Sequence, residues 1–183
     1  MVRYHDEEWG VPCHDDVELF ERLALESFQA GLSWSTILHK REAFRSAFRG
    51  FEPAVVAAFD DDDRARLMAD AGIVRNRAKI DATIGNARAW LALGAEAGSV
   101  DGWLAAIVPG PPRRLPPDAA EDALPARTDV SDALSAELRR RGFRFVGSTI
   151  VYAFMQSVGL VDDHVPGCFR YAASDIMPEN FSR

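Results

Sequence analysis

The chain has 183 residues with a formal net charge of -7, and 48% of the residues are hydrophobic. A chain of this length can bury a core without a disulfide or metal to support it, and this composition excludes a disordered protein. No apolar run reaches the roughly 20 residues of a membrane span, and the N-terminus does not resemble a signal peptide, so we expect a cytoplasmic protein. The two cysteines, Cys13 and Cys168, are too few for a disulfide framework.

The negative net charge argues against a uniformly basic surface for nucleic acid, but the basic residues are not evenly spread. They gather in two clusters, Arg75, Arg77 and Lys79 in the first and Arg139, Arg140, Arg141 and Arg144 in the second. The acidic residues gather elsewhere, at residues 60–63 and around Asp118, Glu121 and Asp122. Because arginine donates two parallel hydrogen bonds to phosphate, either basic cluster is a candidate polyanion site. The alternative is that each is a solvated helix surface.

Apolar residues at helical spacing predict helices through most of the chain. After a polar arm, we expect helices at about residues 16–30, 35–50, 76–91, 129–141 and 147–159. We also expect a short helix that starts at Pro53, and a helix that is capped by the aspartates at residues 60–63 and ends near Gly72. Residues 108–127 contain six of the ten prolines and no periodicity, which predicts a long surface excursion. Sustained alternation typical of strands is absent. The pattern therefore predicts an all-α fold, with residues 1–183 forming a single domain.

Residues 23–37 place one acid, Glu26, inside an otherwise apolar helical segment. Gln29 follows it, and Leu32 and Trp34 come after the break at the end of the helix. A carboxylate on the inner side of a helix is costly to bury unless something pairs with it or uses it. An acid, an amide and an indole at one helix end predict a pocket for a flat ligand such as a nucleobase. The alternative is a solvated acid beside a core tryptophan.

Residues 67–85 predict two helices joined by a short turn at Gly72, with Arg75, Arg77 and Lys79 just beyond it. The open N–H groups of such a turn, the start of the second helix and the basic side chains could hold a phosphate of a nucleic-acid backbone. This interpretation makes the hairpin a sequence-independent DNA clamp. The alternative is an ordinary connection between two helices.

His164 and Cys168 stand four residues apart with Pro and Gly between them, a spacing that lets both side chains reach one metal ion. His5 or Cys13 could complete such a site across the fold. The chain contains no zincin motif, phosphate-binding loop, dinucleotide fingerprint or nucleophile elbow, which excludes enzymes of those classes.

Five segments in order resemble the 3-methyladenine DNA glycosylase I family. They are YHDEEWGVP, LFERLALESFQAGLSW, DAGIVRNRAKIDATIGNARA, SDALSAELRRRGFRFVG and GLVDDHVPGC. The resemblance implies a two-lobed, all-α member of the helix-hairpin-helix glycosylase superfamily, with the lesion pocket between the lobes. It also implies an enzyme that flips N3-methyladenine out of double-stranded DNA and hydrolyses its glycosidic bond without cutting the strand.

The resemblance also assigns roles to individual residues. It implies that Glu26 recognises the base, that Tyr4, Trp9 and Trp34 form the pocket, and that Leu32 fills the gap left by the flipped base. The implied ligands of a structural zinc are His5, His164 and Cys168. The cysteine that usually supplies the fourth ligand would lie upstream of Met1, so we expect zinc to be partial or absent, with Cys13 or His14 as a substitute ligand.

Two other functions compete with the glycosylase interpretation. One is a catalytically inactive DNA-binding module of the same fold, and the other is a metal-stabilised interaction protein. Glu26 within an aromatic pocket argues against the first, and the arginines of the hairpin argue against the second. A lyase reaction through the amine of Lys79 is disfavoured, because helical spacing places Lys79 on the side that would face phosphate. The protein is expected to be monomeric.

Overall fold

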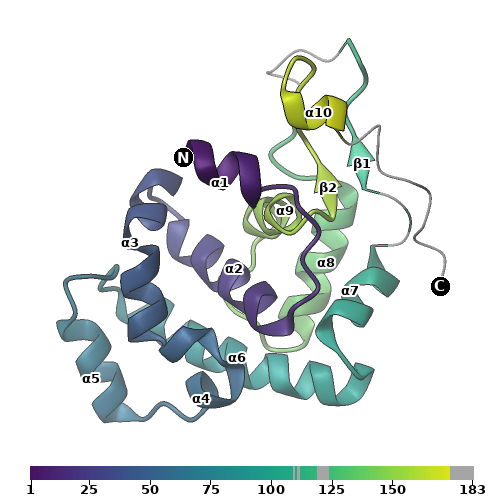
Figure 1. Cartoon of the computed structure of the whole chain (residues 1–183). Coiled ribbons are helices and arrows are strands. Elements are labelled where there is room, and N and C mark those ends of the chain that lie inside the picture. The colour runs from purple at the N-terminus through teal and green to yellow at the C-terminus, as the bar shows by residue number, and fades with distance from the viewer. Residues whose placement is uncertain (109, 111, 119–123, 174–183) are drawn as a thin grey trace.

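The computed structural model describes residues 1–108, 110, 112–118 and 124–173, and these residues are mostly helical (Figure 1). The elements in chain order are α1 (Val2–Glu7), α2 (Asp16–Gln29), α3 (Trp34–Ala47), η1 (Arg49–Phe51), α4 (Pro53–Ala57), α5 (Asp61–Ala69), α6 (Arg77–Ala97), α7 (Val100–Ile107), β1 (Arg113–Arg114), α8 (Asp129–Arg140), α9 (Ser148–Ser157), β2 (Val161–Asp162) and α10 (Phe169–Ala173). The predicted all-α fold class is confirmed. No helix in the described part of the chain is both long enough and apolar enough to span a membrane.

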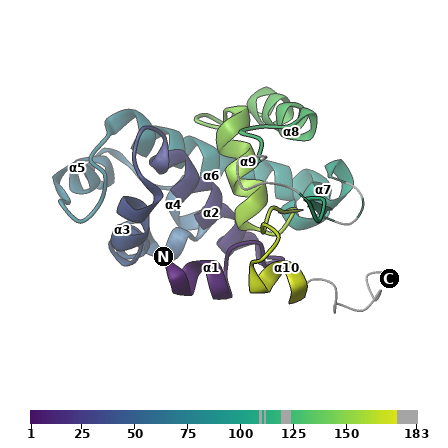
Figure 2. The ribbon, with the colours of Figure 1, turned by 90° about the horizontal axis from the view of Figure 1, so that it is seen from above.

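Helix α2 lies at the centre of the molecule, with α3, α4 and α5 on one side and α7, α8 and α9 on the other (Figure 2). All residues from 19 to 28 are buried, so this helix has no solvated face over most of its length. Four of these buried residues are polar: Glu21, Arg22, Glu26 and Ser27. Buried polar groups need partners or a use, which makes α2 the place to look for function.

Most of the longer helices begin at a residue whose side chain accepts a hydrogen bond from the first turn. These N-cap residues are Asp15, Ser33, Asp60, Asn76, Ser99 and Thr128. Capping satisfies backbone N–H groups that have no partner within the helix. Helix α4 instead begins with Pro53, whose missing N–H is no loss in a first turn.

The sequence did not predict α1, α7, α10 or the two short strands. Within the predicted surface excursion, Arg113 and Arg114 of β1 pair in parallel with Val161 and Asp162 of β2. Leu115, which follows β1, is only 3% exposed. Part of this segment is therefore packed against the fold. Residues 109, 111 and 119–123 of the excursion, including Glu121 and Asp122, lie outside the described residues.

The polar arm between α1 and α2 runs over the C-terminal end of α9. The N–H of Gly10 donates to the carbonyl oxygen of Gln156 at 3.0 Å, and the N–H of Cys13 donates to that of Val158 at 3.2 Å. A side chain at Gly159, where φ is +74°, would place its Cβ 2.6 Å from the backbone nitrogen of Pro12. This close approach fixes the position of the arm, and with it the position of α1.

Candidate active site

A cavity of about 300 Å³ opens where α1, α2, α3 and α9 meet. It is lined by Met1, Tyr4, His5, Trp9, Glu26, Gln29, Trp34, Ala153 and Gln156. The structure thus brings together all the residues predicted for the base pocket except Leu32. The volume suits a small flat ligand, and the lining combines aromatic rings with a few polar groups, as expected of a specific ligand site.

Aromatic side chains form the walls of the cavity. The ring centroids of Tyr4 and Trp34 are 5.4 Å apart, with an angle of 53° between the planes. Trp34 is held at the first position of α3, directly after the N-cap residue Ser33. Trp9 follows α1 and packs edge-on against His164, with ring centroids 4.7 Å apart. The rings come from separate segments of the chain, so the cavity exists only in the folded protein.

Glu26 is the acid of this cavity, and it is only 5% exposed. Burial raises the pKa of its carboxyl group to about 8, although the positive charge of Arg22 acts in the opposite direction. The carboxyl group forms no hydrogen bond or ion pair with another residue in the described ranges. Its hydrogen-bonding capacity is therefore available to a ligand. Burial, and next the charge of Glu26, also raise the pKa of the Tyr4 phenol, which stays a hydrogen-bond donor.

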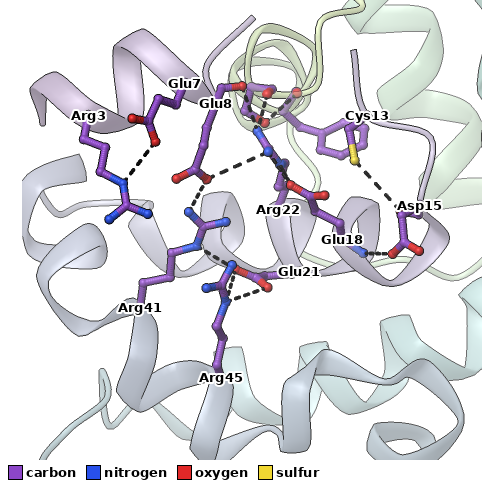
Figure 3. A network of polar contacts seen from close by, with 12 residues as sticks. Arg3, Glu7, Glu8, Cys13, Asp15, Glu18, Glu21, Arg22, Arg41 and Arg45 are labelled. Carbon is purple, nitrogen blue, oxygen red and sulfur yellow. Dashed lines mark hydrogen bonds and ion pairs between the residues drawn. The ribbon is translucent and has the colours of Figure 1, made fainter. Parts of the chain in front are cut away.

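A network of ion pairs fixes the end of α1 against α2 and α3 (Figure 3). Arg41 of α3 donates through Nε to Glu21 at 2.7 Å, and its Nη1 binds the carboxylate of Glu8. Arg45 donates to the same carboxylate of Glu21 at 2.9 Å. Glu21 and Arg41 are buried, so the centre of this network is shielded from solvent, whereas Glu8 and Arg45 are partly exposed. The network orients the arm that carries Tyr4 and Trp9.

Leu32 lies outside the cavity, in the turn between α2 and α3, and is 39% exposed. Gly31 provides the positive φ of 81° that the turn requires. The N–H of Leu32 donates to the carbonyl oxygen of Gln29 at 2.7 Å, and the side-chain amide of Gln29 donates back to the carbonyl oxygen of Leu32 at 3.2 Å. An exposed apolar side chain on a tightly bonded turn beside the cavity fits the predicted role of filling a gap in the duplex.

The predicted hairpin is present, with residues 70–76 connecting α5 and α6. Arg75 is exposed, and its side chain forms no hydrogen bond or ion pair within the described residues. Arg77 is also exposed, with its Nε 3.2 Å from a carboxylate oxygen of Asp81. Both arginines remain candidates for phosphate contacts.

Two of the residues predicted to hold phosphate, Gly72 and Lys79, instead bond to other groups of the protein. The N–H of Gly72 donates to the carboxylate of Asp70 at 2.7 Å, and a Cβ at Gly72 would lie 3.0 Å from the Cβ of Ala43. Gly72 therefore serves close packing and has no open N–H for phosphate. Lys79 is only 7% exposed, and its ammonium donates to the carbonyl oxygens of Phe28 and Ala30. The prediction that Lys79 faces phosphate is wrong, because its side chain turns inward to the end of α2.

Two arginines of the second basic cluster, Arg140 and Arg141, are paired with acids. Arg141 binds Glu137 at 2.7 Å and Glu96 at 2.8 Å, and Arg140 binds Glu137 at 2.6 Å. These pairs lower the pKa of the Glu137 carboxyl group to about 2. Arg139 and Arg144 are exposed and form no side-chain ion pair within the described residues, so this cluster also remains a candidate for phosphate contacts.

His5, His164 and Cys168 form the predicted candidate metal cluster, with their ligand atoms all within 4.8 Å of one another. The Sγ of Cys168 lies 3.5 Å from Nε2 of His5. Nδ1 of His164 is 2.7 Å from the carboxylate of Asp162, while its Nε2 is buried without a hydrogen-bond partner in the described part of the chain. A histidine oriented by a carboxylate, with its other nitrogen directed at a thiol and a second imidazole, suits zinc.

The predicted substitute ligands do not join this cluster. Nδ1 of His14 binds the carboxylate of Asp101 at 3.0 Å. The Sγ of Cys13 is 4.0 Å from the carbonyl oxygen of Asp15, and burial raises the pKa of its thiol to about 11. Neither side chain belongs to the group around His164.

Sequence reasoning missed the contribution of α9 to the cavity, which consists of Ala153 and Gln156. The sequence predicted which residues of α9 are buried in the core. Ala153 and Gln156 lie beside that buried face and are partly exposed. The amide nitrogen of Gln156 donates to the carboxylate of Asp163 at 2.8 Å. The signal in the sequence was the one side-chain amide of this helix.

The fold and the cavity together define a helical protein with an aromatic pocket that contains one buried acid. The sequence model of the methyladenine glycosylase family matches residues 1–171, and the chain belongs to this family. DNA-3-methyladenine glycosylase 1 of Escherichia coli (strain K12) is 48% identical over 170 residues, which are 93% of this chain and 90% of that protein. A crystal structure of 3-methyladenine DNA glycosylase I matches with a TM-score of 0.88 and 49% identity, covering 92% of each chain. A structure that addresses 3-methyladenine recognition by the Staphylococcus aureus enzyme matches with a TM-score of 0.87 and 40% identity, covering 92% of this chain and 89% of that chain.

Proposed function

We propose that this protein is a DNA-3-methyladenine glycosylase, which removes N3-methyladenine from alkylated double-stranded DNA and leaves an abasic site for base excision repair. The observation that carries the proposal is the buried carboxyl group of Glu26, which faces an aromatic cavity without a partner of its own. A protein that only binds DNA has no need of a buried acid in such a cavity. The family and its named relatives support the same reaction.

Recognition in this proposal depends on the positive charge of the lesion. Methylation at N3 makes adenine in DNA a cation, and an aromatic face attracts a cation by roughly 0.5–2 kcal/mol. The Tyr4 and Trp34 rings provide such faces. Glu26 accepts a hydrogen bond from the edge of the base, and the bond strengthens when the carboxyl group is ionised. Entry of the cation therefore favours loss of the Glu26 proton, whereas neutral adenine gains neither effect.

The hydrolysis step needs little acid catalysis, because the cationic base is already a good leaving group. The bond between N9 and C1′ breaks, and its electron pair stays with the base, which leaves uncharged. Positive charge moves to the sugar, where water adds through its oxygen at C1′ and releases a proton to solvent. Lys79 is held away from the cavity by the carbonyl oxygens at the end of α2, so its amine does not replace water as the nucleophile. This supports a monofunctional enzyme.

Access to the base requires it to leave the duplex stack. In the proposed complex, α5 and α6 act as a helix-hairpin-helix element, with Arg75 and Arg77 on the phosphates and Leu32 in the gap left by the flipped base. The exposed large hydrophobic residues in the described part of the chain are Met1, Val2, Leu32, Val55, Leu91, Val130 and Phe169. They belong to different elements, which favours a monomer. The place of action would be the cytoplasm, where bacterial DNA lies.

We further infer that His5, His164 and Cys168 hold a zinc ion with a structural role. When bound, zinc would tie α1 to the segment that follows β2. His5 also lines the cavity, so the ion would stabilise one wall of the base pocket. Within the described residues three side chains reach this site, and with water as the fourth ligand zinc would bind more weakly than in a closed site.

The test is base release from duplex DNA treated with a methylating agent. We expect chromatography to show free 3-methyladenine and the DNA to gain heat-labile abasic sites, while the strand itself stays intact. Glu26→Gln serves as the matched control. Binding to methylated duplex without release of any base would contradict the proposal and favour the inactive DNA-binding module.

A further inference from the structure

The chain has 21 basic residues, of which only Lys40 and Lys79 are lysines. Both lysines use the ammonium group in the same way, as a donor to two backbone carbonyl oxygens at the end of another element. The two elements they hold are the turn that carries Leu32 and the turn between α5 and α6. Neither lysine contacts the cavity.

Lys79 lies in the first turn of α6, directly after the hairpin. Its Nζ donates to the carbonyl oxygens of Phe28 and Ala30, both at 2.7 Å. These carbonyls belong to the C-terminal end of α2, where helix carbonyls lack partners within the helix and the dipole favours a cation. The second accepting residue, Ala30, directly precedes Gly31 and Leu32, so Lys79 anchors the start of the Leu32 turn.

Lys40 makes the reciprocal connection. It lies on α3, which begins two residues after Leu32. Its Nζ donates to the carbonyl oxygens of Ala71 at 3.0 Å and Gly72 at 3.1 Å. Close packing of Gly72 against Ala43 of α3 accompanies these bonds.

We propose that Lys40 and Lys79 are positioning residues that join the Leu32 turn and the hairpin turn into one rigid unit. Each turn is held by a lysine from the helix that follows the other turn. The inference rests on the proposed function, in which the hairpin holds phosphates and Leu32 fills the gap in the duplex. Contact of Arg75 with a phosphate then fixes where Leu32 enters the base stack.

The chemistry explains why lysine serves here although the chain otherwise uses arginine. An ammonium is a compact charge with three donors, which can bind two carbonyl oxygens of one helix end, whereas a guanidinium is a planar fork suited to carboxylate and phosphate. The Lys79 site is nearly closed to solvent. Removal of the ammonium would leave buried carbonyl oxygens unsatisfied and free the turn to move.

The test compares Lys79→Met and Lys40→Met with Arg88→Met in single-turnover excision and in DNA binding over a range of salt. Arg88 is the matched control, because it is exposed on the same helix as Lys79 and also donates to a backbone carbonyl oxygen, that of Ala57 at 2.9 Å. We expect each lysine variant to slow excision by about 10- to 100-fold, since a small displacement of a positioning group has effects of that size. The salt slope of binding should stay unchanged, because neither ammonium touches phosphate. Arg88→Met should excise at the wild-type rate.

A double-mutant cycle separates positioning from a general loss of structure. If Lys79 acts through Leu32, then Leu32→Ala combined with Lys79→Met will be no slower than the slower single variant. Full additivity of the two effects would overturn the inference, and so would a salt slope reduced by about 1 in Lys79→Met, which indicates a lost phosphate contact.

Amide hydrogen exchange of the free protein provides a measurement that does not depend on catalysis. We expect Lys79→Met to speed exchange at Leu32, and Lys40→Met to speed it at Gly72 and Ile73, with exchange in α9 unchanged. Unchanged exchange at these turns would overturn the inference even if the wild-type protein proves active. Absence of base release by the wild-type protein would instead count against the proposed function, while the exchange data still test the coupling. If Lys79→Met does not fold, Lys40→Met, which alters a partly solvated side chain, carries the same comparison.

Discussion

Glu26 and Arg22 lie one helical turn apart on α2, but their charged groups do not pair. The guanidinium of Arg22 instead donates to the carbonyl oxygens of Ser157 at 2.5 Å and Glu8 at 3.3 Å, and its Nε donates to Glu18 at 3.2 Å. These bonds use Arg22 to connect α2, α9 and the arm. The carboxyl group of Glu26 is therefore buried and faces the cavity without a charged partner.

Glu26→Gln should reduce single-turnover excision of N3-methyladenine by about 100- to 1,000-fold, because it removes a charge that acts on a developing reaction centre in a dry site. The amide is nearly isosteric, so the protein should stay folded. Rates are to be measured on a defined duplex with one lesion, with circular dichroism as the check on folding. Wild-type rates in this variant would remove Glu26 from the base-recognition role.

The same variant should change how stability depends on pH. The folded-state pKa of Glu26 is raised to about 8 from a usual value of 4.5. The folded protein therefore holds this proton more tightly than the unfolded chain does. The contribution of this group to the free energy of unfolding is fully present below pH 4.5, decreases between pH 4.5 and about 8, and is lost above that pH. Glu26→Gln has no such proton. Its free energy of unfolding relative to wild type should rise by about 3 to 5 kcal/mol from acidic to alkaline pH. Urea unfolding at a series of pH values measures this difference, and a difference independent of pH would contradict the burial argument.

Arg75→Ala should weaken binding to damaged and undamaged duplexes alike and lower the slope of log K against log salt by about 1, as expected for one lost phosphate contact. Fluorescence anisotropy with both duplexes measures this effect. Arg88→Ala, which removes an arginine from the far part of α6, is the control and should leave the slope unchanged. A loss confined to the damaged duplex would move Arg75 from the phosphate clamp to the base pocket.

Zinc content should be less than one ion per chain after purification, because within the described residues His5, His164 and Cys168 supply three of the four ligands of a closed site. A chelator should remove the metal without unfolding the protein, since the ligands lie outside the main hydrophobic cluster. Elemental analysis combined with thermal unfolding in the presence and absence of chelator tests both parts. One tightly held zinc whose removal unfolds the chain would contradict both.

The sequence was sufficient to predict most helices and five of the residues that line the cavity, namely Tyr4, Trp9, Glu26, Gln29 and Trp34. Glu26 could be recognised because one acid in an apolar helix demands an explanation, and the structure places it in the cavity. The position of Lys79 could not be predicted, because helical spacing gives the direction of a side chain but not what lies opposite it. Helix α1 was missed since it buries no residue and so has no apolar stripe. Gln156 was missed because its role depends on contact between α9 and a distant arm.

Helix α1 supplies Tyr4 and His5 to the cavity, yet it buries none of its residues in the hydrophobic core. It is retained by polar links near its end, such as the Glu8 carboxylate on Arg41 and the backbone bond from Gly10 to Gln156. Breaking these links costs far less than global unfolding, because no core surface becomes exposed. One wall of the cavity can thus move aside while α2 and its neighbours stay packed. An excised base is thus held on one side by a short helix whose displacement does not require unfolding of the core.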